Sequence, residues 1–504
     1  MSGVPVSVIE ARAAHARGDA ARMLELVEQY PLELWYSMSP GELQTMLLAV
    51  PREAFASSPS AEIFRRMFSR TPVDGQIANE PQLRAVMEAD PDTRSWLVFA
   101  AAAEARVRGD AASAWERVQS LLGRQGAPVT HVIDATRGAH TFFVIQAALT
   151  AALAGRAVDA LALYERSLLQ AVPFGLEWFV REAHVRSAVL LALYGRREAA
   201  RARLERSRAV RRTTSWVEPL LDADAELAET LLAPLEHAEA AAERVLTFSL
   251  DQMGEMWPLY AAAIQRVTAP TSRRAEGRAR IERMRTAGLG GPGATGIVGS
   301  VIPLTLAIDD LLTGNMVRAR SELNMADPDL WQTKITAALH AVLTGAPARA
   351  KQLLAAMRPD TQGLTQVEGR RIAVSVMAAL ATGDEATLRD GLAWLAPVIT
   401  AHEYVLLRAF APGALEYAVE HIPGWPAHLD LAVEAAGLLD RPALTERELD
   451  VLAGLARGMS RQDVARHLFL SPNTVKTHQS SLYRKLGVSD AGAAVREAAR
   501  LGLV

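Results

Sequence analysis

The chain of 504 residues contains no cysteine and few aromatic residues, which make up 6% of the total. Without cysteine it has no disulfides, thiolate metal sites or cysteine nucleophiles, as is typical of proteins in a reducing cytoplasm. No apolar run approaches the roughly 20 residues that a membrane-spanning helix needs, and the N-terminus lacks a basic start followed by an apolar core. We therefore expect a cytoplasmic protein without a membrane partner.

Motifs for catalysis and cofactor binding are also missing. The sequence has no Gly-x-Ser-x-Gly elbow, no His-Glu-x-x-His metal motif and no phosphate-binding loop that ends in Gly-Lys-Ser/Thr. Residues 288–296, GLGGPGATG, contain Gly-x-Gly-x-x-Gly twice, but a charged helical pattern precedes them where a dinucleotide site needs a buried strand. We interpret this segment as a flexible loop between helices. The sequence predicts no enzyme, no cofactor and no metal site.

The composition favours helices, since Ala, Leu and Arg dominate and all three have high helix propensity. A chain of this length predicts two or more domains or an extended repeat array. One short signature recurs: a helix end, a Gly, then polar residues that open a second helix. An Ala follows five residues later in five copies, and an apolar or aromatic residue follows nine residues later in all copies. The copies lie at Gly18, Gly109, Gly155, Gly195, Gly314, Gly345 and Gly383, and the alanines are Ala114, Ala160, Ala200, Ala319 and Ala350.

This signature predicts helical hairpins. Gly ends the first helix in a left-handed cap, the small Ala lets the two backbones approach, and the larger residue fills the seam one turn on. The region resembles a degenerate tetratricopeptide-like array, similar to the sensor of maltose-regulator-type activators but without their ATPase module. That resemblance implies a surface for a small-molecule or protein effector. Another all-helical bundle is the alternative. The Arg-rich stretches from Arg196 and Ser272 contain interleaved Glu, which favours solvated helix faces over nucleic-acid patches.

The end of the chain differs in charge from the rest. Residues 441–504 carry ten Lys/Arg and six Asp/Glu, a net charge of +4, whereas the preceding 440 residues carry 44 and 51, a net charge of −7. A basic end on an acidic body indicates a polyanionic partner for that end. Capping residues divide it into four short helices. They open at Thr445, Ser460, Ser471 and Ser489, and the third runs to Leu486 before Gly487.

The second and third of these helices, with the short turn between them, form a helix-turn-helix. Val475, Leu482 and Leu486 recur at helical spacing and predict the buried stripe of the third helix. Its outer face has small hydroxyls that allow close approach to a major groove, and basic side chains that reach guanine or phosphate. The candidate DNA-binding residues are Ser471, Asn473, Thr474, Lys476, Thr477, His478, Ser480, Ser481, Arg484 and Lys485.

Residues 444–488 resemble the LuxR-type helix-turn-helix nearly end to end, through Leu444-Thr445, Arg447-Glu448, Thr474-Val475-Lys476 and Lys485-Leu486-Gly487-Val488 among other matches. The resemblance implies transcriptional regulation through a four-helix domain, with a homodimer on double-stranded DNA. It places Lys476, Thr477 and Ser480 towards the bases, and Thr474 and Lys485 towards the backbone. Read from the residues alone, Ser471 is a helix cap, and His478 fits a packed, hydrogen-bonded position better than a base contact.

We therefore predict an all-α protein that regulates transcription. A tetratricopeptide-like sensor or interaction region spans residues 1–425, a linker helix spans 426–440, and a LuxR-type DNA-binding domain spans 441–504. The alternative function is a protein-interaction scaffold whose helix-turn-helix docks a partner in place of DNA.

Overall fold

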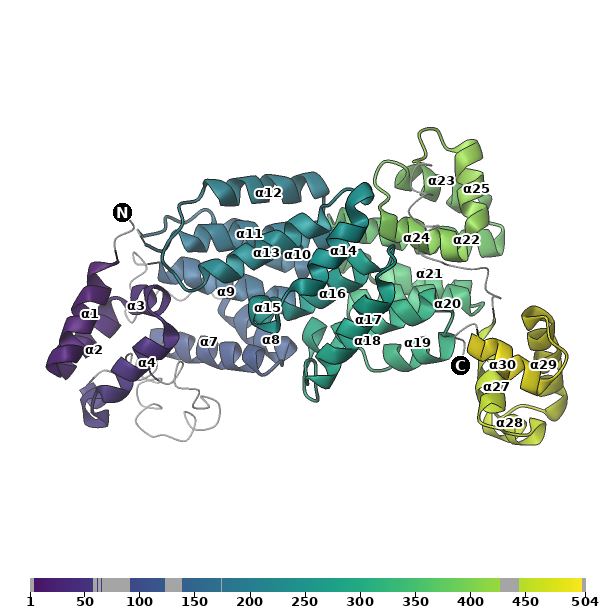
Figure 1. The fold of residues 1–504 in the computed structure, drawn as a ribbon, viewed down its shortest axis with the longest axis horizontal. Helices are drawn as coiled ribbons and strands as arrows, with labels where there is room; N and C mark the ends of the chain where they lie inside the picture. The colour runs from purple at the N-terminus through teal and green to yellow at the C-terminus, as the bar shows by residue number, and fades with distance from the viewer. Residues whose placement is uncertain are drawn as a thin grey trace. The chain divides into compact units, whose positions relative to one another are not determined.

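The computed structural model describes residues 4–57, 61, 65, 91–122, 138–173, 175–426 and 444–500. Helices dominate these ranges, and no β-strand occurs within them (Figure 1). The prediction of an all-α protein is confirmed. The chain separates into two compact units, one made of residues 1–232, 248–257 and 292–298, the other of residues 233–247, 258–291 and 299–504.

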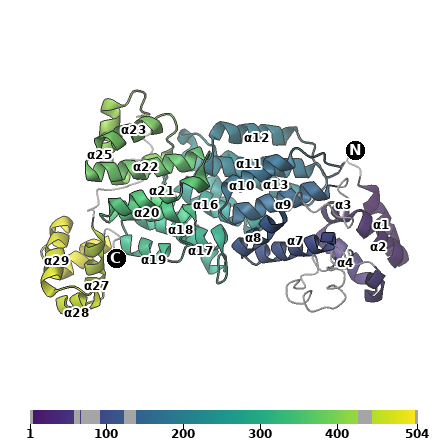
Figure 2. The same cartoon turned by 180° about the vertical axis from the view of Figure 1, so that it is seen from behind.

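The first unit is a succession of short antiparallel helix pairs. Neighbours in sequence such as α9 and α10, or α11 and α12, pack side by side, as the two opposite views show (Figures 1 and 2). Its α-helices are α1 Val6–Arg17, α2 Ala20–Gln29, α3 Pro31–Ser37, α4 Pro40–Ala49, α7 Pro91–Val107, α8 Ala111–Leu122, α9 Ala139–Leu153, α10 Ala157–Ser167, α11 Trp178–Tyr194, α12 Arg197–Ala209, α13 Glu218–Leu231 and α15 Leu250–Met253, with 3-10 turns η1 Arg52–Ser57 and η5 Gly254–Met256.

The second unit continues in the same style and ends in four short helices. It contains most of α16 Trp257–Thr268 and α18 Gly296–Leu312. Its other elements are η4 Leu235–His237, α14 Ala238–Thr247, α17 Arg274–Thr286, α19 Met316–Leu323, α20 Trp331–Leu343, α21 Pro347–Ala356, η6 Arg358–Thr361, α22 Thr365–Thr382, α23 Glu385–Leu395, α24 Ala401–Phe410, α25 Pro412–His421, α27 Glu446–Ala456, α28 Arg461–His467, α29 Pro472–Leu486 and α30 Ala491–Arg500.

The seven glycines of the repeated signature separate consecutive helices at every copy, from α1–α2 to α22–α23. Six of them adopt left-handed backbone angles with φ between 67° and 91°. Gly195 is the exception, because its φ of −104° and ψ of −148° are extended, so the left-handed prediction is wrong there. A glycine is favoured at this position for a different reason, because a Cβ atom there would stand 2.6 Å from Cδ2 of Leu191.

The small and large positions of the signature pack as predicted. All five alanines that follow the glycines by five residues are fully buried, with 0% of their surface exposed. Of the seven larger residues four positions further on, six are buried and Leu323 is partly exposed. Alanine allows close backbone approach and loses no rotamer freedom on burial, which explains its use at these seams.

The interior of the first unit also holds rings and charges that the sequence patterns did not reveal. Tyr36 contacts Trp178 at 4.1 Å between ring centroids, and Trp178 contacts Phe179 at the same distance. Nearby, Glu182 pairs with Arg186, and both side chains are buried. Burial raises the pKa of Glu182 above its usual value.

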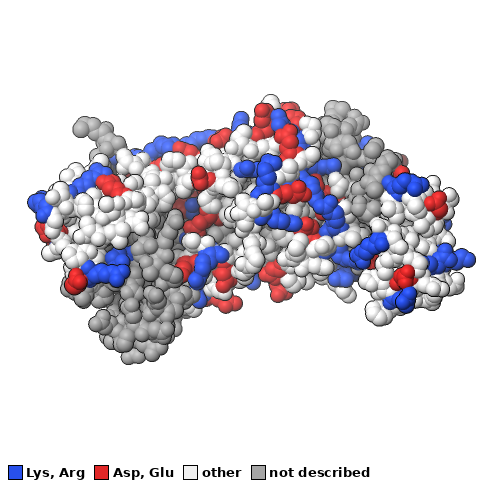
Figure 3. All heavy atoms as spheres, turned by 60° about the horizontal axis from the view of Figure 1, so that its bottom comes forward, with Lys and Arg blue, Asp and Glu red and all other residues white. Residues whose placement is uncertain are grey.

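The Arg-rich helices α12 and α17 form ion pairs with neighbouring carboxylates. Arg208 of α12 lies 2.6 Å from Glu229, and Arg278 of α17 lies 2.7 Å from Asp309 and 2.8 Å from Asp310. Basic and acidic side chains are interspersed on the face in Figure 3. These pairings support the interpretation of the Arg-rich stretches as helix faces with balanced charge.

The glycine-rich segment 288–296 lies between two helices. It follows α17, and α18 begins at its last glycine, Gly296, so no strand precedes it. Gly288, Gly290 and Gly293 have positive φ, as a tight irregular turn requires. The prediction of an inter-helix loop is confirmed.

The predicted linker helix and domain boundaries involve residues that the structure does not describe. The linker helix predicted over 426–440 lies almost entirely within 427–443, outside the described residues, so the domain boundaries stay predictions.

Within the described part of the chain, no helix has the length and apolar character to span a membrane. The same part contains no group of three or more His, Asp or Glu side chains placed to hold a metal ion.

The left-handed cap at Gly383 can be tested against a helical glycine of the same unit. Gly383→Ala should destabilise the α22–α23 hairpin by about 1 kcal/mol, because φ of 72° disfavours any Cβ. Gly413→Ala in α25 should be neutral or stabilising by up to about 1 kcal/mol, since a Cβ there meets only Leu380 at 3.9 Å. Amide hydrogen exchange of α22–α25 measures both effects; equal destabilisation by the two changes would contradict the assignment.

Candidate nucleic-acid interface

Four capped helices form the C-terminal part of the chain. Thr445, Ser460 and Ser471 cap their helices as predicted, and Gly487 ends α29 with φ of 69°. Thr445 with Glu448, and Ser460 with Asp463, form reciprocal capping boxes. The cap of α30 differs from the prediction. Asp490, in place of Ser489, accepts a hydrogen bond from the backbone N–H of Ala493 at 2.7 Å. Asp is as good a cap as Ser, and the helix begins one residue later than Ser489 would require.

Helix α29 packs against α27, α28 and α30 through its inner face. Val475 and Leu482 are fully buried and Leu486 is 7% exposed, which confirms the predicted stripe. Gln479 is also buried, at 5% exposure, although its polar side chain gave no sign of this. Its amide oxygen accepts a hydrogen bond from Nε of Arg461 at 2.8 Å, so the burial leaves no unsatisfied acceptor and ties α28 to α29.

The opposite face of α29 is open to solvent. None of the residues in α29 is acidic, so this face combines hydroxyl, amide and basic groups without a carboxylate. His478 is only partly exposed, as expected for a packed position. The predicted interface residues that are exposed are Ser471, Asn473, Thr474, Lys476, Thr477, Ser480 and Arg484.

Local hydrogen bonds organise the first turn of this face. The hydroxyls of Ser471 and Thr474 lie 2.8 Å apart, and the Thr477 hydroxyl donates to the backbone oxygen of Asn473 at 3.2 Å. Each hydroxyl keeps further hydrogen-bonding capacity for a ligand. The Lys476 ammonium is different, because no side-chain or backbone group within the described ranges engages it. It is a mid-helix charge without a structural partner.

Ser481 and Lys485 lie on the side of α29 that faces α27. Both are partly buried, and the Lys485 ammonium lies 2.8 Å from a Glu448 carboxylate oxygen. That carboxylate is 4% exposed and also accepts the backbone N–H of Thr445 at 2.6 Å. Burial alone would raise the pKa of Glu448, but the hydrogen bonds from Lys485, Thr445 and Ser481 outweigh it and hold the pKa below its usual value.

Phe469 in the turn between α28 and α29 is a feature that sequence reasoning missed. It is the non-glycine residue with positive φ, 55°, among the described residues, and its side chain is 96% exposed. A left-handed phenylalanine is strained, and exposing the ring gains no burial energy to offset that strain. Phe469 lies two residues before Ser471, the cap of α29.

Comparison with known proteins identifies the class of this domain. Residues 442–498 match the family described as bacterial regulatory proteins, luxR family. The C-terminal part of the chain is therefore a LuxR-type helix-turn-helix domain, and the predicted resemblance is confirmed for this part. The match begins at residue 442 and covers none of the region ahead of it.

Individual relatives each match a short part of this chain. A probable transcriptional regulatory protein NarL of Mycobacterium tuberculosis is 51% identical over 63 residues, which are 12% of this chain and 29% of that protein. A putative HTH-type transcriptional regulator of Mycobacterium bovis is 39% identical over 100 residues, 19% of this chain and 10% of the relative. The transcriptional regulatory protein UhpA of Salmonella typhimurium is 39% identical over 87 residues, which are 17% of this chain and 44% of that protein. The matched part spans less than half of each relative.

The pairing of Glu448 makes the stability of the domain sensitive to acid. A folded pKa held below the unfolded value of about 4.3 stabilises the domain above that pH, and the stabilisation is lost as pH falls through the folded pKa. Glu448→Gln should destabilise the domain by roughly 1–3 kcal/mol at pH 7, with a smaller difference from wild type below pH 4. Amide exchange of α29, corrected for the intrinsic pH dependence, measures this; a difference independent of pH would contradict it.

The strain at Phe469 can be separated from the loss of its ring by two substitutions. Phe469→Gly should stabilise the domain by up to about 1 kcal/mol, because glycine accepts φ of 55° without cost. Phe469→Ala removes the ring but keeps the strain, so its effect should stay within about 0.5 kcal/mol. Exchange of the α28 and α29 amides compares the two variants. Strong destabilisation by both would instead show that the ring is packed in solution.

Proposed function

We propose that this protein is a DNA-binding transcriptional regulator whose α29 reads the major groove of duplex DNA. The observation that carries the proposal is the open face of α29, which is exposed and free of acidic residues. The helix itself is capped by Ser471 at its start and Gly487 at its end. Caps hold the start of a recognition helix in register against base edges. The names of the relatives, all transcriptional regulators, support the same function.

The proposed roles follow from exposure and partners. Lys476, Thr477 and Ser480 face the bases, with Lys476 donating to guanine acceptors or phosphate. Asn473, Thr474 and Arg484 are exposed on the same helix, and in this proposal they contact the DNA backbone. In this proposal Ser471 caps α29 and His478 packs against the domain, so both stabilise the helix and neither contacts a base. Lys485 and Ser481 act through Glu448, and a phosphate contact by Lys485 stays a prediction that competes with this ion pair.

The proposal extends to the helical region ahead of this domain. We assign it as a tetratricopeptide-like array that binds a small-molecule or protein effector, supported by seven glycine-separated helix pairs whose five signature alanines are fully buried. Repeats of paired helices commonly present binding surfaces of this kind. We further propose a homodimer on DNA, since two-fold-related half-sites are the common arrangement for helix-turn-helix regulators.

Lys476→Ala tests the central claim. The DNA is a duplex that the wild-type chain has enriched from random sequence. The substitution should weaken binding to it about 10-fold, equivalent to about 1.4 kcal/mol. It should also reduce the slope of log affinity against log salt concentration by about one. Fluorescence anisotropy at several salt concentrations measures both quantities. The far-UV circular dichroism should not change, because Lys476 has no packing role.

Lys351→Ala is a charge-matched control on α21. Its ammonium is 3.4 Å from Asp384 and lies outside the α27–α30 domain, so DNA affinity should not change. Unchanged affinity in Lys476→Ala would remove that residue from the interface. If the wild-type chain itself showed no salt-dependent DNA binding, the scaffold alternative would replace the regulator.

A further inference from the structure

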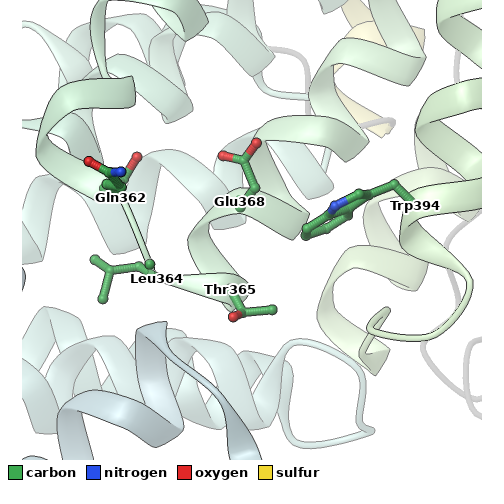
Figure 4. Close-up of a pocket in the computed structure, with 7 residues that line it drawn as sticks. Gln362, Leu364, Thr365, Glu368 and Trp394 are labelled. Atoms are coloured by element: carbon green, nitrogen blue, oxygen red, sulfur yellow. The ribbon is translucent and has the colours of Figure 1, made fainter.

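A cavity of about 500 Å³ opens in the second unit, where the turn before α22 and the start of that helix lie beside α23. Figure 4 shows Gln362 and Leu364 on one side of the hollow and Trp394 of α23 on the other, with Glu368 and Thr365 between them. The volume lies within the range of about 300–1,000 Å³ that is usual for small-molecule sites.

Trp394 provides an open aromatic surface in this cavity. Its side chain is 38% exposed, whereas Leu392 and Leu395 beside it on α23 are fully buried. The ring lies close to α22, since a Cβ at Gly369 would stand 3.8 Å from its Cζ3 atom. Indole is the strongest of the aromatic side chains in attracting a cation to its face.

Glu368 supplies the negative charge of the cavity. It is the ionisable side chain among the lining residues, which include no Lys, Arg or His. Arg371 holds its carboxylate in a two-point pair, with distances of 2.5 and 2.8 Å, and so fixes its orientation. A carboxylate offers about four acceptor positions, so this pair leaves capacity for a second partner. The lining offers no free cation to an anionic ligand, because Arg371 lies outside it and is engaged by Glu368.

We infer that the cavity binds an organic ammonium cation, whose charged nitrogen lies over the Trp394 indole and faces the Glu368 carboxylate. Cation–π attraction and an opposed carboxylate are the two interactions that recognise alkylated ammonium groups. The site deepens the proposed function, on which its regulatory meaning rests: an amine-containing small molecule is the effector class of the array.

Binding is tested on the full chain without DNA. Choline should bind saturably by isothermal titration calorimetry, and 3,3-dimethyl-1-butanol, which has the same shape without the charge, should bind at least about 10-fold more weakly. Absence of saturable choline binding, or equal affinity for the two compounds, overturns the inference.

Variants assign the binding to this cavity. Glu368→Gln and Trp394→Leu should each weaken choline binding about 10-fold, and Trp394→Phe should fall between Trp394→Leu and wild type. Glu385→Gln is the matched control, because this exposed carboxylate at the start of α23 lies nine residues from Trp394, on the opposite face of the helix, and does not line the cavity. Circular dichroism checks that every variant is folded. Equal losses in Glu368→Gln and Glu385→Gln would place the binding elsewhere and overturn the assignment.

The effector role is read from DNA affinity with and without choline. A change of at least about 3-fold in the wild-type chain, abolished by Glu368→Gln, supports the role. Saturable choline binding without any change in DNA affinity overturns the effector role. Failure of the proposed function is seen separately, as a lack of salt-dependent DNA binding when no choline is present.

Discussion

The geometry of the DNA-binding domain depends on one buried carboxylate. Glu448 closes the cap of α27 through the Thr445 backbone and at the same time accepts the Lys485 ammonium from the far end of α29. A charge that is 4% exposed is costly unless it is fully hydrogen-bonded, so these partners must be present together. The first and third helices of this domain are therefore fixed to each other by contacts within the chain itself. Together with the Arg461–Gln479 contact, this leaves the open face of α29 as a rigid, preorganised surface.

The helical region ahead of it follows another constraint, the close approach of paired helices. Six of the seven signature glycines turn the chain in a left-handed conformation, and Gly195 instead makes room for Leu191. Fully buried alanines such as Ala160 and Ala350 then bring the backbones together. Stability in such pairs comes from many small, local contacts, which suits a region in which one turn can also shape a ligand cavity. The cavity beside α22 and α23 shows this, since the Gly383 hairpin positions Trp394 next to Glu368.

Much of this could be predicted from the sequence, because caps and glycine turns are local. Thr445, Ser460 and Ser471 are recognisable within three or four residues of chain, and the buried stripe of α29 follows from helical spacing. What escaped prediction depends on contacts between distant segments. Gln479 is buried because Arg461 reaches it, and Lys485 turns towards Glu448, 37 residues away. The positive φ of Phe469 could not be predicted from the sequence, because phenylalanine is not a residue type that favours positive φ.

The local pairing of the helices on either side of each signature glycine has a consequence for how the chain acquires its structure. Each pair joins two helices that are neighbours in sequence, so its contacts close short loops and carry a low entropic penalty. Such pairs can form one after another during synthesis, each as soon as its own residues have left the ribosome. The LuxR-type domain follows these pairs in the sequence and would then fold next to a region that is already in place.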